Sequence, residues 1–379
     1  MELIGHIRLR PGMYIGMIGD GAEPNHGIYT LLREIVNNSV DEFTDGYGTE
    51  IIIDIDYDGQ VSIRDFGRGI PFDQIIRMVS SSVDLKCDHK GKSIGLASVG
   101  LAVVASLSES NTVVSYREGE CQVMCFSRGK LISSERMITT ETDGLRVMFK
   151  PDSDVFANFA YRMDIVREII KEYCYLRRGL RIILNGESFI YENGLHDMIS
   201  EYISSAPLYE LIHIYNDDFE IVFTHTDNQE EDIRSYVNGH YTPKGGTHLT
   251  AFRKAITKVM SDYFKTKLSV SETCKGIVCA FNVNLSNPYF TGACKFELYS
   301  KHMWEYDDGN AGPSIYNSIK HFLSSMLPEL LAGNNSLTNI IKSRSENVWD
   351  QYERQLCQST GQWEMSGMYL SNLERAVAG

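Results

Sequence analysis

The sequence predicts an α+β protein built from layers of helices and sheets. A long helical stretch at 26–45 is followed by two alternating strands, 50–57 and 61–65, joined by an Asp-Gly turn. The order of helix and then sheet recurs further along the chain, which is the pattern of an α+β sandwich. A length of 379 residues is enough for two to three domains.

The first unit is expected to begin with an irregular segment at 1–25, whose glycine- and proline-bracketed stretch 10–16 forms a fixed loop on the core. Its further helices are predicted at 73–82, 95–107 and 161–175. Its further strands are predicted at 112–117, 122–126, 130–133, 145–150 and 181–184.

The second unit is expected to begin near residue 205. Its strands are predicted at 209–215, 219–226, 233–237 and 276–285. The glycine-led segment 245–248 opens a helix at 248–265, and long helices run from about 310 to 378. Few turn residues interrupt this last stretch, so it resembles a stalk or bundle.

Composition excludes several classes of protein. The chain is 43% hydrophobic and 23% charged, as in ordinary globular proteins. No apolar run approaches the ~18 residues of a membrane span, and the N-terminus carries no secretory signal. Eight cysteines without Cys-x-x-Cys spacing indicate free thiols in a reducing cytoplasm. A net charge of −14 argues against unspecific wrapping of nucleic acid by the whole chain, but it permits a local basic track.

Three polar residues share one face of the helix at 26–45. Glu34, Asn38 and Asp41 stand at i, i+4 and i+7 beside an apolar row. A carboxylate can orient or deprotonate a water, and an amide oxygen can bind a hard cation such as Mg²⁺. By itself, the same pattern also fits a solvated acidic helix face.

Two glycine-containing stretches fit a phosphorylated ligand. In the segment 65–69, Asp65 ends a strand, and glycines 67 and 69 let the backbone approach a ligand closely. The Asp65 carboxylate could accept a hydrogen bond from the amino group of a purine. In the segment 93–101, glycines near a helix start can direct N–H groups at a phosphate. A plain tight turn and close helix packing are the respective alternatives.

A lysine in the second unit adds a third element. Lys295 follows the stretch 288–292, which ends in glycine, and could reach a terminal phosphate as a point charge. Taken alone, it also fits an ordinary surface lysine.

Taken in this order, the motifs resemble those of the gyrase, Hsp90, histidine-kinase and MutL (GHKL) ATPase superfamily. Four further segments narrow the resemblance to one group within this superfamily. They are the loop at 10–16, Val237-Asn238-Gly239, the segment 245–248 and the loop around 295. They resemble the ATPase and transducer regions of bacterial type IIA topoisomerase B subunits, over nearly the whole chain. The runs 31–34 and 93–96 look more like topoisomerase IV than gyrase.

The resemblance implies a GHKL-type (Bergerat) sandwich at 1–200, followed at 201–379 by a ribosomal-S5-domain-2-like transducer domain with long C-terminal helices. It implies that Glu34 is the general base and that Lys295 contacts the γ-phosphate. Asn38 matches the Mg²⁺ ligand, and Asp65 matches the acceptor of the adenine amino group. The ATP-binding set is expected to comprise Asn38, Asp41, Asp65, Gly67, Arg68, Gly69, Ile70, Pro71, Gly95, Leu96, Ala97, Ser98, Val99, Gly100, Leu101, Arg117 and Leu145.

The sequence also departs from the family pattern. Ala97-Ser98 replace His-Gly in the phosphate-binding lid, and Ala293-Cys294-Lys295 replace Gln-Thr-Lys. Leu145 stands where a threonine helps the adenine-binding aspartate, and Thr30 stands where the family has a histidine. If the lid glycine needs a positive φ, Ser98 costs about 1–2 kcal/mol. The segment before the 10–16 loop is short, so the dimer contact that the family makes there is expected to be weaker.

The expected function is that of a type IIA topoisomerase B-subunit ATPase region. Binding of ATP and Mg²⁺ would close a homodimeric clamp around DNA, and hydrolysis would reopen it during strand passage, decatenation or relaxation. The expected partner is a topoisomerase A subunit. The expected location is the cytoplasm, with no membrane association. One alternative is a nucleotide-sensing dimerisation module with little turnover, given Ser98, Leu145 and Ala293. Another is a different GHKL ATPase, such as a mismatch-repair protein.

The chain is not expected to cleave DNA alone, because the Glu-Gly-Asp-Ser-type loop and the Asp-x-Asp pair of the cleavage metal site are missing from the sequence. It is expected to be an N-terminal portion of a longer subunit or a stand-alone remnant. Supercoiling and decatenation stay open alternatives, since the regions that decide between them are absent from this sequence.

Overall fold

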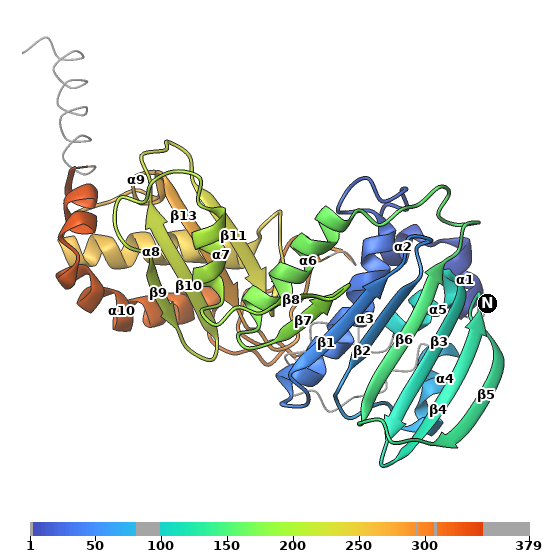
Figure 1. Ribbon diagram of the computed structural model, residues 1–379. Coiled ribbons are helices and arrows are strands. Elements are labelled where there is room, and N and C mark those ends of the chain that lie inside the picture. The colour runs from blue at the N-terminus through green and yellow to red at the C-terminus, as the bar shows by residue number, and fades with distance from the viewer. Residues whose placement is uncertain (1–2, 81–98, 293–294, 307–308, 344–379) are drawn as a thin grey trace, which may run out of the picture.

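The computed structural model describes residues 3–80, 99–292, 295–306 and 309–343 and contains two mixed α+β units, each built on its own sheet (Figure 1). The predicted α+β class is confirmed. None of the helices in the described ranges is both long and apolar enough to cross a membrane.

The first unit contains a sheet of eight strands in the order β5-β4-β3-β6-β2-β1-β7-β8. Its strands are β1 (Glu50–Ile55), β2 (Val61–Asp65), β3 (Ser108–Arg117), β4 (Glu120–Ser127), β5 (Lys130–Ile138), β6 (Gly144–Pro151), β7 (Arg181–Leu184) and β8 (Glu187–Phe189). Neighbouring strands are antiparallel except β1 and β7, which run parallel. Strand β2, which ends at Asp65, therefore lies between β6 and β1 in the middle of the sheet.

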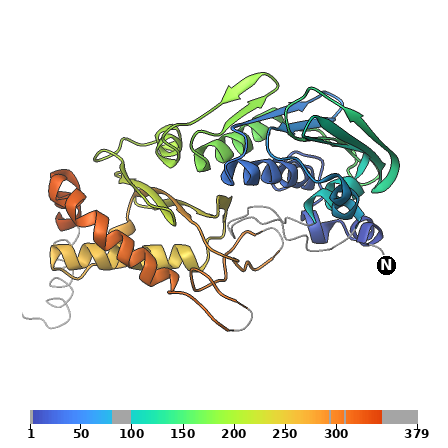
Figure 2. The same ribbon diagram turned by 90° about the horizontal axis from the view of Figure 1, so that it is seen from below.

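Helices cover one side of this sheet, as Figure 2 shows. They are α1 (Leu3–Leu9), α2 (Gly12–Ile15), α3 (Gly27–Thr44), α4 (Phe72–Ser80), α5 (Gly100–Ser106) and α6 (Met163–Leu176). Leu32, Val36 and Val40 of α3 are fully buried in the core between the layers. Because these side chains fix how α3 is rotated on the sheet, they also fix where its polar face points.

The second unit contains a five-stranded sheet in the order β12-β11-β13-β10-β9. Its strands are β9 (Ile212–Tyr215), β10 (Phe219–His225), β11 (Asp232–Val237), β12 (His240–Tyr241) and β13 (Ile277–Val283). Its helices are α7 (Leu195–Tyr202), α8 (Thr247–Phe264), α9 (Val270–Cys274) and α10 (Ile315–Gly333). Helices α8 and α10 share one core with the inner side of the sheet, and α7 packs with α6 in a separate core.

The structure corrects several sequence expectations. Residues 1–25 are not wholly irregular, because α1 and α2 form there and bury Ile7 and Ile15 in the first core. Strand β5 continues to residue 138, beyond the predicted 133, because it pairs with β4 along its length. Strand β8 and helices α7 and α9 were not foreseen, and the predicted helices beyond residue 343 lie outside the described residues.

Candidate active site

Helix α3 presents Glu34 toward the beginning of α5. The Glu34 Oε2 atom is buried and has no hydrogen-bond partner among the described residues. A Cβ atom on Gly100 would lie 2.4 Å from this oxygen, so only glycine leaves the carboxylate its present place. An unsatisfied buried carboxylate oxygen is costly for stability and therefore points to a ligand or reaction at this position.

Lys295 reaches Glu34 from the second unit. Burial raises the pKa of Glu34 to about 7, Lys295 acts in the opposite direction, and the Asp41 carboxylate adds to the rise. Burial lowers the pKa of Lys295, and the carboxylates of Glu34 and Asp41 oppose this effect. The structure thus brings together three predicted site residues from two units. A carboxyl group with a pKa near 7 suits a general base at neutral pH.

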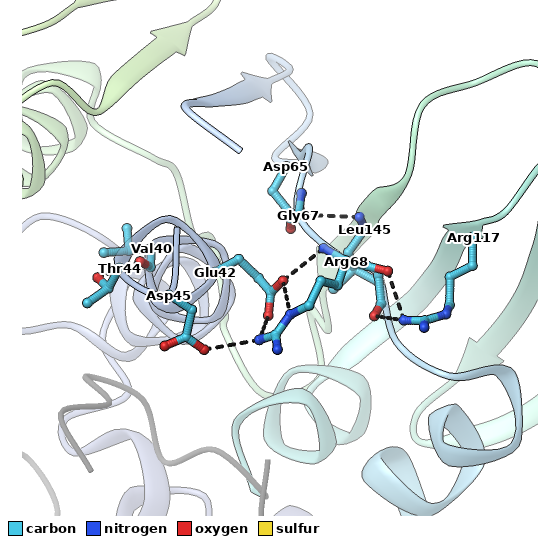
Figure 3. Close-up of polar contacts among 10 residues, drawn as sticks. Val40, Glu42, Thr44, Asp45, Asp65, Gly67, Arg68, Arg117 and Leu145 are labelled. Carbon is cyan, nitrogen blue, oxygen red and sulfur yellow. Dashed lines mark hydrogen bonds and ion pairs between the residues drawn. The ribbon is translucent and has the colours of Figure 1, made fainter. Parts of the chain in front are cut away.

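Asp65 forms the second part of the site at the end of β2. Its Oδ1 accepts hydrogen bonds from the backbone N–H groups of Gly67 at 3.0 Å and Leu145 at 3.1 Å (Figure 3). Its Oδ2 accepts a hydrogen bond from the Ser39 hydroxyl at 3.0 Å. Burial raises the pKa of Asp65, and these three donors oppose the rise. The carboxylate is therefore held in one orientation before any ligand arrives.

The loop after Asp65 is held against α3 by Arg68. The guanidinium donates to Glu42 at 2.8 and 3.0 Å and to Asp45 at 3.0 Å (Figure 3). It also lies over the Tyr47 ring. The hydrogen bonds to Glu42 raise the pKa of Arg68, burial opposes this rise, and the Asp45 charge adds to it. The net effect is a raised pKa. Gly67 is required here, since a Cβ would lie 2.7 Å from the Glu42 side chain.

A second arginine holds the other side of this loop. Arg117 donates from one nitrogen to the carbonyl oxygens of Arg68 and Gly69, both at 2.8 Å. The Ser115 hydroxyl accepts from the Ile70 N–H at 2.9 Å and donates to the Ile70 carbonyl at 2.7 Å. Gly69 has a φ of 66°, which favours glycine. Pro71 directly precedes α4 and is partly buried.

The remaining predicted residues take different positions. Residues 95–98 of the predicted lid lie outside the described residues. Val99 directly precedes α5, but Leu101 points into the core and is 3% exposed. The Leu145 side chain is likewise buried in the core, so this residue contributes to the Asp65 environment through its backbone alone. Asn38 is partly buried one helical turn after Glu34 and could supply an amide oxygen to Mg²⁺.

Comparisons with known proteins show the family to which the chain belongs. The family described as "Histidine kinase-, DNA gyrase B-, and HSP90-like ATPase" matches residues 24–153, and the family "DNA gyrase B" matches residues 193–309. The B subunit of DNA topoisomerase 4 from Borreliella burgdorferi is 38% identical over 302 residues, which are 79% of this chain and 50% of the relative. The chain belongs to the type IIA topoisomerase B-subunit family of GHKL ATPases.

The chain is also similar to two DNA gyrase B proteins, one compared by sequence and one by structure. The DNA gyrase B subunit of Clostridium acetobutylicum is 32% identical over 332 residues, covering 79% of this chain and 51% of the relative. The chain spans about half the length of these relatives. The crystal structure of the 43K ATPase domain of Thermus thermophilus gyrase B, solved in complex with an aminocoumarin, superposes with a TM-score of 0.72. It is 26% identical and covers 93% of this chain and 98% of that one.

Sequence reasoning missed four residues of this candidate site. Ser39 binds Asp65, Ser115 brackets the loop, and Glu42 and Asp45 hold Arg68. Position on α3 gave one usable signal, because Glu42 follows Asp41 directly and lies two turns from Glu34. The contact between Ser115 and Ile70 joins residues 45 positions apart and had no such signal.

Proposed function

We propose that this chain is the ATP-operated clamp portion of a type IIA topoisomerase B subunit. ATP would bind in the first unit and the second unit would act as the transducer, with the second unit beginning at α7 (Leu195–Tyr202), close to the predicted boundary at 200. The observation that carries the proposal is the buried, unpartnered Glu34 oxygen beside Gly100, with Lys295 supplied from the second unit. This is the arrangement expected of a base that awaits a water and of a cation that awaits a phosphate.

Each group then has one role in the reaction. Glu34 accepts the proton of the attacking water, while Lys295 places positive charge at the γ-phosphate. Asp65 accepts a hydrogen bond from the adenine amino group, and the loop at 67–71 lines the pocket for the base. Asn38 would hold Mg²⁺, which neutralises phosphate charge when bound. Because Lys295 comes from the second unit, contact with the γ-phosphate would couple nucleotide state to the relative position of the two units.

The second unit offers a surface for the DNA of the proposed clamp. A groove of about 540 Å³ beside α8 is lined by Lys254, Lys258, Lys265 and Lys267, with Asp262 as its acidic residue. This local positive charge contrasts with the chain's net charge of −14. Phosphate backbones are attracted to such clusters without base contacts. Two copies of the chain, a topoisomerase A subunit and a cytoplasmic setting complete the proposal.

One structural observation favours the alternative of a nucleotide switch with little turnover. The Leu145 side chain is buried in the core and brings no hydroxyl to Asp65. The Ser39 hydroxyl supplies a donor to this carboxylate instead, so nucleotide binding is expected in both cases. The two functions differ in whether bound ATP is hydrolysed. The raised pKa of Glu34 suits a general base and therefore favours the clamp, which hydrolyses ATP.

Native mass and phosphate release, measured together, separate these functions. With a non-hydrolysable ATP analogue and Mg²⁺, the clamp is expected to dimerise. With ATP, it is expected to release phosphate, and Glu34→Ala is expected to abolish this release while nucleotide binding persists. Dimerisation without phosphate release in the wild type would favour the switch, and absence of nucleotide binding would refute both.

A further inference from the structure

Helix α6 lies between the two units and touches both (Figures 1 and 2). Two adjacent residues of α6, Glu172 and Tyr173, contact α3 directly beside its predicted catalytic residues. The Tyr173 hydroxyl donates a hydrogen bond of 2.5 Å to the Asn37 Oδ1 atom. Both side chains are buried, with 6% and 4% exposure. Asn37 immediately precedes Asn38, so this bond restrains the backbone from which the candidate Mg²⁺ ligand projects.

Glu172 makes the second contact of α6 with α3. Its carboxylate lies 3.6 Å from the guanidinium of Arg33, which immediately precedes Glu34. Burial raises the pKa of Glu172, and the Arg33 charge opposes this rise. Further along α6, Tyr175 and Leu176 share an apolar core with Tyr236 of β11 in the second sheet. Helix α6 therefore contacts both the second sheet and the residue next to Glu34.

Packing alone does not require these polar contacts. The apolar face of α3, with Leu32, Val36 and Val40, already attaches the helix to the sheet. A buried hydrogen bond is directional and costly to leave unmade. The bond at Asn37 therefore adds a directional restraint on the turn that carries Asn38 to the orientation that the core already sets.

We propose that Tyr173 and Glu172 are positioning residues for the hydrolysis site, with Tyr173 fixing the direction of Asn38 and Glu172 holding Arg33 on the turn that carries Glu34. This inference rests on the proposed ATPase function. Because α6 also packs against the second sheet, it adds a contact between the second unit and α3 that is separate from Lys295.

The first test removes one hydroxyl. Tyr173→Phe keeps the buried ring and loses the bond to Asn37. In the full chain, kcat for phosphate release is expected to fall about tenfold, with KM for ATP changed less than about twofold. The Mg²⁺ concentration for half-maximal rate is expected to rise. Asn37→Asp keeps an acceptor and should retain activity, whereas Asn37→Leu should behave like Tyr173→Phe.

Tyr161→Phe is the matched control. The Tyr161 hydroxyl also donates to α3, at the Ile28 carbonyl 3.2 Å away, but in the first turn, remote from Asn38. This variant should lose comparable thermal stability and keep wild-type kcat and Mg²⁺ dependence. If both phenylalanine variants lower kcat equally, or if neither does, Tyr173 has only a structural role and the inference is overturned.

A double-mutant cycle tests the contact between Glu172 and Arg33. Glu172→Gln and Arg33→Met should each lower kcat several-fold, and the double variant should be no slower than the worse single variant, because both changes remove one contact. Additive effects would refute this role of the contact. A wild-type chain that neither binds nor hydrolyses ATP would refute the proposed function itself, whereas an active wild type with unaffected variants would refute only the role of α6.

Discussion

At the scale of the residue, Glu34 shows how function opposes stability. Its carboxyl group has a pKa of about 7 in the folded chain, against an ordinary value of 4.5, so it is easier to protonate when folded. Below pH 4.5 both states are protonated and the group has no effect. As the pH rises to 7, the unfolded chain loses this proton first, so the group increasingly disfavours folding. In the proposed reaction the ionised form is the base, which gives a reason for this cost.

The first prediction follows from that sign. Glu34→Gln should make the folded chain more stable than the wild type at about pH 7 to 8, by at most on the order of 3 kcal/mol. The difference should shrink as the pH falls toward 4.5. Urea unfolding at several pH values measures it.

Asp73→Asn, at an exposed acid of α4, makes the same chemical change outside the site and should follow the wild type at each pH. If Glu34→Gln also follows the wild type in the alkaline part of this range, the carboxylate is not destabilised by burial, and its assignment as a tuned base loses its main support.

At the scale of the element, the loop that follows β2 depends on its neighbours. Residues 66–71 have no regular backbone pairing, so Arg68 and Arg117 supply the contacts that hold them. The sequence pointed to Asp65, Gly67 and Gly69 because an acid and glycines after a strand are a local pattern. It could not point to Ser115, because contacts across the sheet depend on strand order, and β2 and β3 are separated by β6.

Arg68→Met tests this arrangement. The variant keeps a long side chain but loses the contacts to Glu42 and Asp45, so the loop is expected to sample more conformations before binding. We expect ATP affinity to fall about tenfold, since ordering the loop then opposes binding. Because Arg68 is 38% exposed, the free energy of unfolding should fall by only about 1 kcal/mol or less. Calorimetric titration and urea unfolding measure the two effects.

Arg162→Met is the control for this element. Arg162 pairs with Asp164 at the surface, where both side chains are more than half exposed. Neither ATP affinity nor stability should change there. If Arg68→Met binds ATP as tightly as Arg162→Met, the loop does not need its anchor on α3.

At the scale of the whole molecule, the site exists only because two units meet. Lys295 has a left-handed backbone, with a φ of 54°, and interacts electrostatically with Glu34 and Asp41 from across the unit boundary. The ammonium group opposes the protonation of Glu34, and in the proposed function it also contacts the γ-phosphate. Its removal should therefore affect the reaction more than nucleotide binding.

Lys295→Met is expected to lower kcat for phosphate release by about a hundredfold, as loss of one charge-stabilising group does in other enzymes. The dissociation constant for the ATP analogue should rise much less. Lys301→Met, at an exposed lysine six positions along the chain, should keep wild-type kinetics. A variant with weakened nucleotide binding and an unchanged rate would assign Lys295 to binding rather than to the reaction.

The sequence by itself determined the elements and chemical groups whose signals are local. Helix α3, strands β1 and β2, and the residues Glu34, Asn38 and Asp65 were predicted from helical spacing, alternation and turn residues. Only the tertiary structure decided that α1 and α2 form, that β5 extends to 138, and that Leu145 serves Asp65 through its backbone. It also decided that the Glu34 Oε2 atom is buried rather than solvated, because a helix face becomes a site or a surface according to what packs beside it. Here Gly100 and Lys295, distant in the chain, make that difference.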